Sequence, residues 1–301
     1  MRKVPALLGL VLLVGAAGCP PDGGRFNLLR PSGVQGPLPA DSPTPVKEDL
    51  VAYLNNISAN NPGIQSEDIG LTCYSGGPIG IPLSGKIRAQ GPRSFRMVGR
   101  AMGSDEVDLG SNDKEFWYWI RRGDRYQFFC SYQAIEEGNV KHMPFPFQPD
   151  WVLEAMGMGK YGPAEKYELI KDADKIKLVE RTKSPQGIPV KKVIVFNSRK
   201  AKSADQPQIT DFLLLDDKTN KLICSAHISR RQIIGNKVEL PRELELSWPE
   251  QNFKLALHLD NIQLNKQIPP QVFVRSQLQG VPSFDLASGR VEGMQQAGGK
   301  K

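Results

Sequence analysis

Apolar residues recur at every second position along most of the chain after Ile69, which is the period of a β-strand with two different faces. Short polar or glycine-containing turns separate these runs. The intervals are too short for the helices that connect parallel strands. The pattern therefore predicts one strongly curved antiparallel sheet. Its strands are expected at 69–75, 83–90, 94–101, 105–110, 115–120, 125–132, 166–171, 175–182, 189–197, 209–216, 221–230 and 253–264, with one more strand that ends at residue 248.

Two segments have the period of a helix instead. Apolar residues between Val46 and Ile57 are three or four positions apart, Thr44 is the expected N-cap, and the polar run 60–63 ends the helix. A second, short helix is expected at 151–158, after the proline-rich break PFPFQP. Both helices should pack on one face of the sheet, so the predicted fold class is mainly β, of the α+β type.

The run KEFWYWI is unusual because apolar side chains project from both of its faces. Alternation places Trp117 and Trp119 on one face, and Phe116, Tyr118 and Ile120 on the other. A strand with one solvated face does not have this pattern. Either further layers of the protein cover both faces, or one face is concave and encloses a hydrophobic guest. Burial of a sixteen-carbon chain could contribute up to ~12 kcal/mol at ~0.8 kcal/mol per methylene, without any catalytic group.

The first 45 residues have the composition of a leader and a tether. A basic pair and an apolar run of signal-peptide length lead through small residues to Cys19, which predicts a signal peptide at 1–18 and a lipid-modified cysteine at position 19. The alternative is an ordinary signal peptide that leaves Cys19 as a spare thiol. Residues 19–45 are rich in proline and glycine, as in a linker, and residues 289–301 form a tail without a core pattern. The folded domain is therefore expected at 46–288.

The charge of the 301-residue chain is only moderately basic. Lysine and arginine number 39 against 32 acidic residues, which gives a net charge of +7, and two of the cations belong to the expected signal peptide. No basic stripe stands out, so nucleic acid is not an expected partner. Cys73, Cys130 and Cys224 remain beside Cys19, and the sequence leaves open whether two of them form a disulfide or all three are free.

Several motifs suggest catalysis but lack the context that catalysis needs. The G-x-G-x-x-G match at 157–162 follows a helix, whereas a dinucleotide-binding loop follows a strand, so we interpret its glycines as a helix terminus. None of His142, His227 and His258 lies at metal-ligand spacing from another histidine or a cysteine. We therefore expect no cofactor, no metal and no enzymatic activity.

The order of several weak motifs resembles a known family. The segment LSGKIRAQGPRSFRMVGRAMGSDEVDLGSNDKEFWYWI and the closing segment LDNIQLNKQIPPQVFVRSQLQGVPSFDL resemble the periplasmic lipoprotein carriers and outer-membrane lipoprotein receptors of the LolA/LolB-like, lipoprotein-sorting family. The resemblance extends over roughly residues 46–286. Two departures are the Gly91 that precedes Pro92, where the carriers have an arginine, and the insert PFPFQPDWVLEAMGMGKYG, which has no obvious counterpart.

The resemblance implies a curved half-barrel sheet whose open side is covered by helices and encloses an acyl-chain cavity. On this hypothesis Phe95, Trp117, Trp119 and Phe128 line the cavity. The partners are then the acyl chains of lipids or lipoproteins, the membrane through lipidated Cys19, and a soluble carrier protein. The expected location is the periplasmic face of the outer membrane.

Two alternatives stay open at this point. A structural or assembly lipoprotein of the cell envelope could use the same fold to hold protein partners, with a filled core and an exposed patch near residues 144–152. A lipid hydrolase would need a nucleophile beside His227 or His258.

Overall fold

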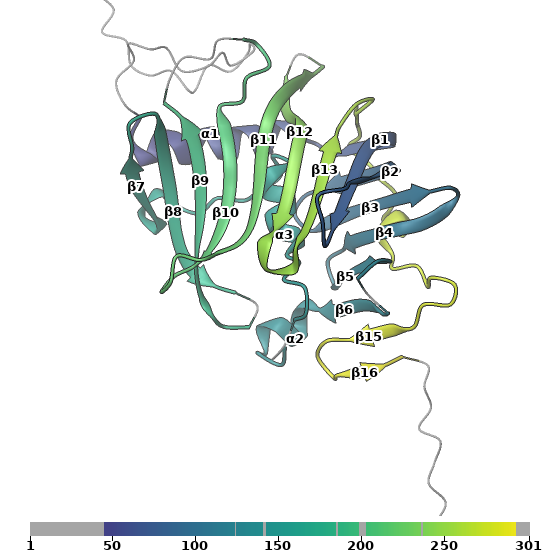
Figure 1. The fold of residues 1–301 in the computed structure, drawn as a ribbon. Helices are drawn as coiled ribbons and strands as arrows, with labels where there is room; N and C mark the ends of the chain where they lie inside the picture. Colours follow the sequence, from purple (N-terminus) through teal and green to yellow (C-terminus); the bar gives the residue numbers. More distant parts are fainter. Residues whose placement is uncertain are drawn as a thin grey trace, which may run out of the picture.

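The protein folds around a single curved sheet whose two ends do not meet (Figure 1). The computed structural model describes residues 45–123, 125–140, 143–184, 186–198, 203–235 and 237–292. The expected signal peptide, Cys19, His142 and the chain beyond residue 292 lie outside these ranges. The prediction of a mainly β fold with one curved sheet is confirmed.

Two antiparallel meanders make up the sheet. The first consists of β1 (Ile64–Ser75), β2 (Ile81–Gln90), β3 (Ser94–Ala101), β4 (Ser104–Ser111), β5 (Glu115–Ile120) and β6 (Gln127–Ser131). The second consists of β7 (Tyr167–Lys171), β8 (Lys175–Lys183), β9 (Pro189–Asn197), β10 (Ile209–Asp216), β11 (Leu222–Ile234), β12 (Val238–Trp248) and β13 (Phe253–His258). Within each meander every strand pairs with the next, as expected where short turns connect strands.

The first and last of these strands join the two meanders. β1 pairs antiparallel with β13, from Gly70 opposite His258 to Ser75 opposite Phe253, and β14 (Gln263–Leu264) pairs with the beginning of β1. β15 (Ser283–Asp285) then adds parallel to the free edge of β6, and β16 (Arg290–Val291) pairs with β15. The parallel β15–β6 pair departs from the predicted antiparallel arrangement. After β14 the chain crosses the outer side of the sheet, and it therefore reaches the free edge of β6 in the same direction as β6.

The α-helices lie on one side of the sheet, which we call the inner face, and α1 (Lys47–Asn60) crosses it behind β9–β11 in Figure 1. The residue before this helix is Val46, whose backbone N–H lies 3.4 Å from the Asp49 carboxylate. The predicted cap residue, Thr44, lies outside the described residues. The other helices are α2 (Tyr132–Glu136), α3 (Pro149–Ala155) and the short 3-10 turns η1 (Ala164–Lys166), η2 (Pro249–Gln251) and η3 (Pro270–Phe273).

The helix α2 was not expected, because the pattern predicted a strand to residue 132. The Ser131 hydroxyl oxygen accepts a hydrogen bond of 3.1 Å from the backbone N–H of Ala134 and so caps α2. The strand ends at this serine. The apolar residues that follow point into the core from a helix, with Tyr132 and Ala134 buried.

Candidate functional site

The inner face is where the resemblance placed a cavity, and the insert, residues 144–162, fills much of it. Phe145 packs between the meanders, with its ring centroid 4.7 Å from that of Trp248 and 5.3 Å from that of Tyr118. Phe147 and Trp151 extend the contacts, at 6.2 Å from Phe116 and 6.0 Å from Trp248. The insert therefore bridges the first and second meanders through aromatic packing.

Residues 144–152 do not form the expected exposed patch, because only Pro144 among them is exposed. Phe145, Phe147 and Trp151 are each at most 5% exposed. The curvature of the sheet leaves a concavity on its inner side, and the bulky residues of the proline-rich break fill it from α3 and from the segment just before it.

The four residues predicted to line one cavity lie on two different faces. Phe95 and Phe128 are on the inner face, where Phe128 stacks on Tyr118 at 5.2 Å. Trp117 and Trp119 are on the opposite, outer face, because strand alternation turns them away from Tyr118. All four are buried. The sheet register separates them, so they do not surround a common cavity.

A charged network holds Trp117 on the outer face. Its indole Nε1–H donates to the Asp108 carboxylate at 3.2 Å, Gln127 Nε2 donates to the same group at 3.2 Å, and the Arg96 guanidinium lies 3.1 Å from it and over the indole ring. Burial raises the pKa of Asp108, although Arg96, Trp117 and Gln127 act in the other direction. Gly110 makes room for the ring, since a Cβ there would lie 2.2 Å from Trp117 Cζ2.

The chain's own C-terminal segment covers these outer-face residues. Residues 265–286, which we call the strap, run across the first meander: Arg96 donates to Val274 O at 2.7 Å and Asn112 Nδ2 donates to Phe273 O at 2.9 Å. Phe273 is only 3% exposed. The apolar residues on the second face of β5 are therefore covered by protein.

A larger hollow lies at one end of the inner face, between the insert and the ends of β9, β10 and β11. Its volume is about 330 Å³, within the range of ligand pockets. Its polar rim includes Gln148, Asp216 and Glu250. Its apolar lining consists of Met143, Pro146, Ile188, Val190, Leu214, Leu222 and Ile223. We take this larger hollow as the candidate site for a hydrophobic guest.

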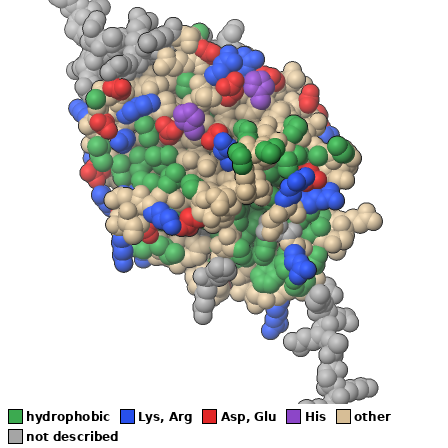
Figure 2. All heavy atoms as spheres, viewed as in Figure 1, with side chains coloured by type: hydrophobic (Ala, Val, Ile, Leu, Met, Phe, Trp, Pro, Cys, Tyr) green, Lys and Arg blue, Asp and Glu red, His purple; other side chains and the backbone are tan. Residues whose placement is uncertain are grey.

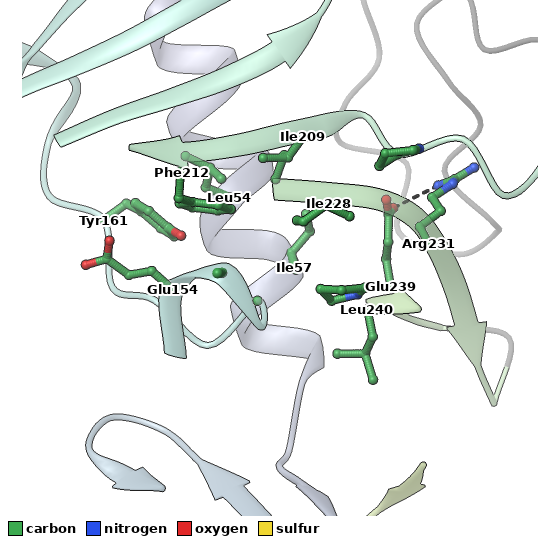
Figure 3. A pocket seen from close by; sticks show the side chains of 14 residues that line it. Leu54, Ile57, Glu154, Tyr161, Ile209, Phe212, Ile228, Arg231, Glu239 and Leu240 are labelled. Carbon is green, nitrogen blue, oxygen red and sulfur yellow. Dashed lines mark ion pairs between the residues drawn. The ribbon is translucent and has the colours of Figure 1, made fainter. Parts of the chain in front are cut away.

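A second cavity, under α1, is much smaller. The volume of this cavity is about 30 Å³. Figure 3 shows Leu54 and Ile57 from α1 facing Phe212 and Ile228 from the sheet. This space holds a few water molecules at most and no acyl chain. A buried ion pair closes one side, with Arg231 Nη1 3.0 Å from Glu239 Oε2.

An ion pair spans from the sheet to α3 beside the larger hollow. Lys192 Nζ lies 2.7 Å from Glu154 Oε1. Burial alone would lower the pKa of Lys192, but the carboxylates of Glu154, Glu180 and Asp150 together raise that pKa, so the ammonium group stays charged. Burial also raises the pKa of Glu154, against the attraction of Lys192.

Lys192 was not among the residues predicted from the sequence, although a signal for it is present. In β9, Val190, Lys192, Ile194 and Phe196 alternate onto the inner face, so a lysine interrupts an otherwise apolar row. Val190 lines the larger hollow, whereas Lys192 and Ile194 line a polar hollow of about 170 Å³ next to it. Lys192 therefore stands at the boundary between the two hollows.

The remaining candidate residues have ordinary partners. His227 Nδ1 lies 2.7 Å from Asp211 and His258 Nε2 lies 2.7 Å from Asp260, both on the exposed outer face (Figure 2). Cys73, Cys130 and Cys224 are buried and free, which settles the question of a disulfide among these three. In the described ranges no helix has the length and apolar character to span a membrane. Those ranges also hold no cluster of three or more side chains suited to a metal ion.

Comparison with known proteins gives structural likeness only. No family model and no curated protein sequence matches the chain. A putative outer membrane lipoprotein-sorting protein domain from Vibrio parahaemolyticus is similar in structure, with a TM-score of 0.46 and 10% identity over 74% of this chain and 95% of that one. A LolA superfamily protein from Nitrosomonas europaea has a TM-score of 0.42 and 7% identity over 74% and 97% of the two chains.

A third similar structure is a DUF1329 family protein from Desulfovibrio piger, with a TM-score of 0.36 and 8% identity over 76% of this chain and 95% of that one. The first two carry names from the superfamily that the sequence motifs resemble, at modest structural overlap and low identity.

Proposed function

We propose that this protein is a lipid-anchored envelope lipoprotein that binds an acyl chain of a lipid or lipoprotein on the inner face of its sheet. In this proposal Cys19 carries the anchor, the domain lies at the periplasmic side of the outer membrane, and the protein takes part in lipoprotein sorting without catalysing a reaction. A soluble carrier would deliver the guest.

The observation that carries the proposal is the larger hollow beside the insert. Its volume of about 330 Å³ and its apolar lining suit a flexible hydrocarbon segment. Six buried methylenes would contribute about 5 kcal/mol at ~0.8 kcal/mol each. Because the insert is packed into the remainder of the concavity, a longer chain requires that Phe145 and its neighbours move aside.

The test is to fill the hollow. The chain carrying Cys19→Ser is purified so that any acyl group comes from solution, and native mass spectrometry measures bound lipid. Ile223→Trp should reduce bound lipid at least tenfold, because the indole would occupy the hollow. Leu213→Trp is the matched control, since Leu213 lies on the outer face of β10.

Two results would count against acyl-chain binding. One is that the unsubstituted chain captures no lipid from extracts or from added fatty acids. The other is that Ile223→Trp and Leu213→Trp bind equally well, which would place the lipid elsewhere.

The filled interior favours a second candidate, a structural or assembly lipoprotein that holds protein partners. The insert occupies the space where a guest was expected, and the cavity under α1 is only about 30 Å³. Cross-linking in cells distinguishes the two candidates: a stable protein partner together with no bound lipid would support the assembly role.

A further inference from the structure

A polar hollow of about 170 Å³ lies on the inner face of the second meander, where the segment after α3 folds back over β8 and β9. Three lysines and two tyrosines contribute to it: Lys160, Lys166, Lys192, Tyr161 and Tyr167. It adjoins the larger hollow, because Val190 and Lys192 are two positions apart on one face of β9, which corresponds to ~7 Å along the strand.

The charges around the polar hollow do not cancel. Two carboxylates, those of Glu154 and Glu180, also line the hollow, so the three lysines leave one positive charge in excess. Glu154 pairs with Lys192 at 2.7 Å, and Glu180 lies opposite Lys192 in the sheet register. Within the described part of the chain, neither Lys160 nor Lys166 forms an ion pair with a carboxylate. Both are exposed at the rim, so the hollow has an excess of positive charge.

The glycine motif 157–162 explains how these groups reach the hollow. A Cβ at Gly162 would lie 2.9 Å from Lys166 Cδ, and a Cβ at Gly159 would lie 2.6 Å from the Tyr161 hydroxyl oxygen. Glycine at both positions lets the lysine and the tyrosine lie directly on the backbone. Burial raises the pKa of Tyr167 to about 12, so its hydroxyl keeps the proton that it can donate.

We propose that the polar hollow binds a phosphate group, and that this phosphate is the headgroup of the amphiphile whose chain occupies the larger hollow. A phosphate offers several acceptor oxygens to the ammonium groups of Lys160 and Lys166 and to the hydroxyl of Tyr167. The inference rests on the proposed acyl-chain site, and it names the guest as an anionic amphiphile.

The experiment varies the headgroup while the hydrocarbon chain stays constant. Isothermal titration of the chain carrying Cys19→Ser uses dodecyl phosphate, dodecyl maltoside and inorganic phosphate, each below any micelle concentration. Dodecyl phosphate should bind about tenfold more tightly than dodecyl maltoside, or about 1.4 kcal/mol. The double variant Lys160→Ala/Lys166→Ala should lose this preference. The double variant Lys171→Ala/Lys183→Ala, which removes the same charge from exposed positions on β7 and β8, should keep it.

Each outcome separates the headgroup site from the chain site. Equal affinity of the unsubstituted protein for the two amphiphiles overturns the headgroup site and leaves the chain site. Inorganic phosphate that binds as tightly as dodecyl phosphate shows a site for free phosphate and also overturns the headgroup assignment. A preference that persists in Lys160→Ala/Lys166→Ala assigns the phosphate to other residues and overturns the proposal. Binding of none of the three compounds overturns both sites.

Discussion

The two meanders have apolar residues on both faces, but their outer faces are protected in different ways. On the first meander the strap lies over Arg96 and Phe129, and Arg96 joins the strap to the buried network around Asp108 and Trp117. On the second meander no such strap is present among the described residues, and Val179, Val193 and Val195 form a small aliphatic cluster with Leu213 and Leu215. Figure 2 shows hydrophobic side chains gathered on this outer surface.

Long charged side chains shield the aliphatic cluster of the second meander. Three long cationic side chains lie next to these valines on the paired strands β8 and β9: Lys177, Arg181 and Lys191. Each ends in a surface ion pair, such as that of Arg181 with Glu168 at 2.7 Å. Their methylene stems cover apolar surface while the charged ends stay in water. A strand that is apolar on both faces therefore indicates that each face is covered, but not whether a chain segment, charged stems or a ligand covers it.

The strongest test of this difference introduces a charge on each outer face. Trp119→Lys should destabilise the fold by about 4 kcal/mol or more, because Trp119 is 6% exposed and a buried, unpaired ammonium group is costly. Leu213→Lys should cost less than about 1 kcal/mol, since Leu213 is half-buried and a lysine can reach water from there. Urea denaturation measures both variants. Equal losses would mean that the outer face of the second meander is also covered.

The next largest effect concerns the network beneath the strap. Asp108→Ala should cost about 3–5 kcal/mol, because it leaves the Arg96 guanidinium, which is 11% exposed, without its partner. Asp105→Ala is the matched control in the same strand. It breaks the exposed pair with Arg100 and should cost less than about 1 kcal/mol. If Asp108→Ala matched Asp105→Ala in urea denaturation, aromatic packing alone would hold the strap.

The sequence pattern was sufficient for most strands, because alternation and turn residues are local signals. It predicted the curved sheet, the N-terminal helix and the short helix of the insert. It missed α2 because the Ser131 cap interrupts a run that otherwise reads as a strand. The parallel pairing of β15 with β6 is a contact between segments far apart in the sequence, and no local pattern predicts it.

The candidate site was harder to predict, because it depends on which segment covers which face. Alternation correctly separated Trp117 from Tyr118, but the pattern could not show that the strap crosses the outer face or that the insert occupies the inner face. The single cavity predicted for Phe95, Trp117, Trp119 and Phe128 combined residues from both faces. Lys192 could have been noticed, since a lysine within the apolar row of β9 needs a partner such as Glu154.

A smaller effect tests how closely Trp117 fits against the sheet. Gly110→Ala should cost about 1–3 kcal/mol, because the added methyl group would lie 2.2 Å from Trp117 Cζ2 and would have to push the indole toward the strap. Gly77→Ala is the control, since a Cβ there would meet no atom within 4 Å. Urea denaturation and near-ultraviolet circular dichroism follow both variants. An unchanged tryptophan signal and unchanged stability in Gly110→Ala would mean that the indole does not fit closely against the sheet.

The smallest expected effect concerns the buried thiols and has a defined sign with pH. Burial raises the pKa of Cys73 to about 11 and that of Cys130 to about 12 in the first meander, and it raises the pKa of Cys224 in the second meander still further. In the unfolded chain a thiol ionises near pH 8.5. Above that pH the unfolded state loses protons that the folded state keeps, so the free energy of unfolding falls as pH rises. For Cys224 the loss between pH 8.5 and 9.5 should be about 1 kcal/mol.

Substitution of one thiol from each meander separates their contributions. Cys224→Ala and Cys130→Ala should each lower stability at pH 7.5 because a buried side chain is shortened, and each should make the decline between pH 8.5 and 9.5 shallower. Urea denaturation at the three pH values, with a reductant present, measures both slopes. Cys130→Ala could reduce the decline of the free energy of unfolding with pH while Cys224→Ala left it unchanged. The Cys224 thiol would then ionise in the folded state as it does in the unfolded chain, which requires that water reaches it beneath the second meander. Such a result would indicate that the wall between the larger hollow and the core opens in solution, which is the motion that a bound acyl chain requires.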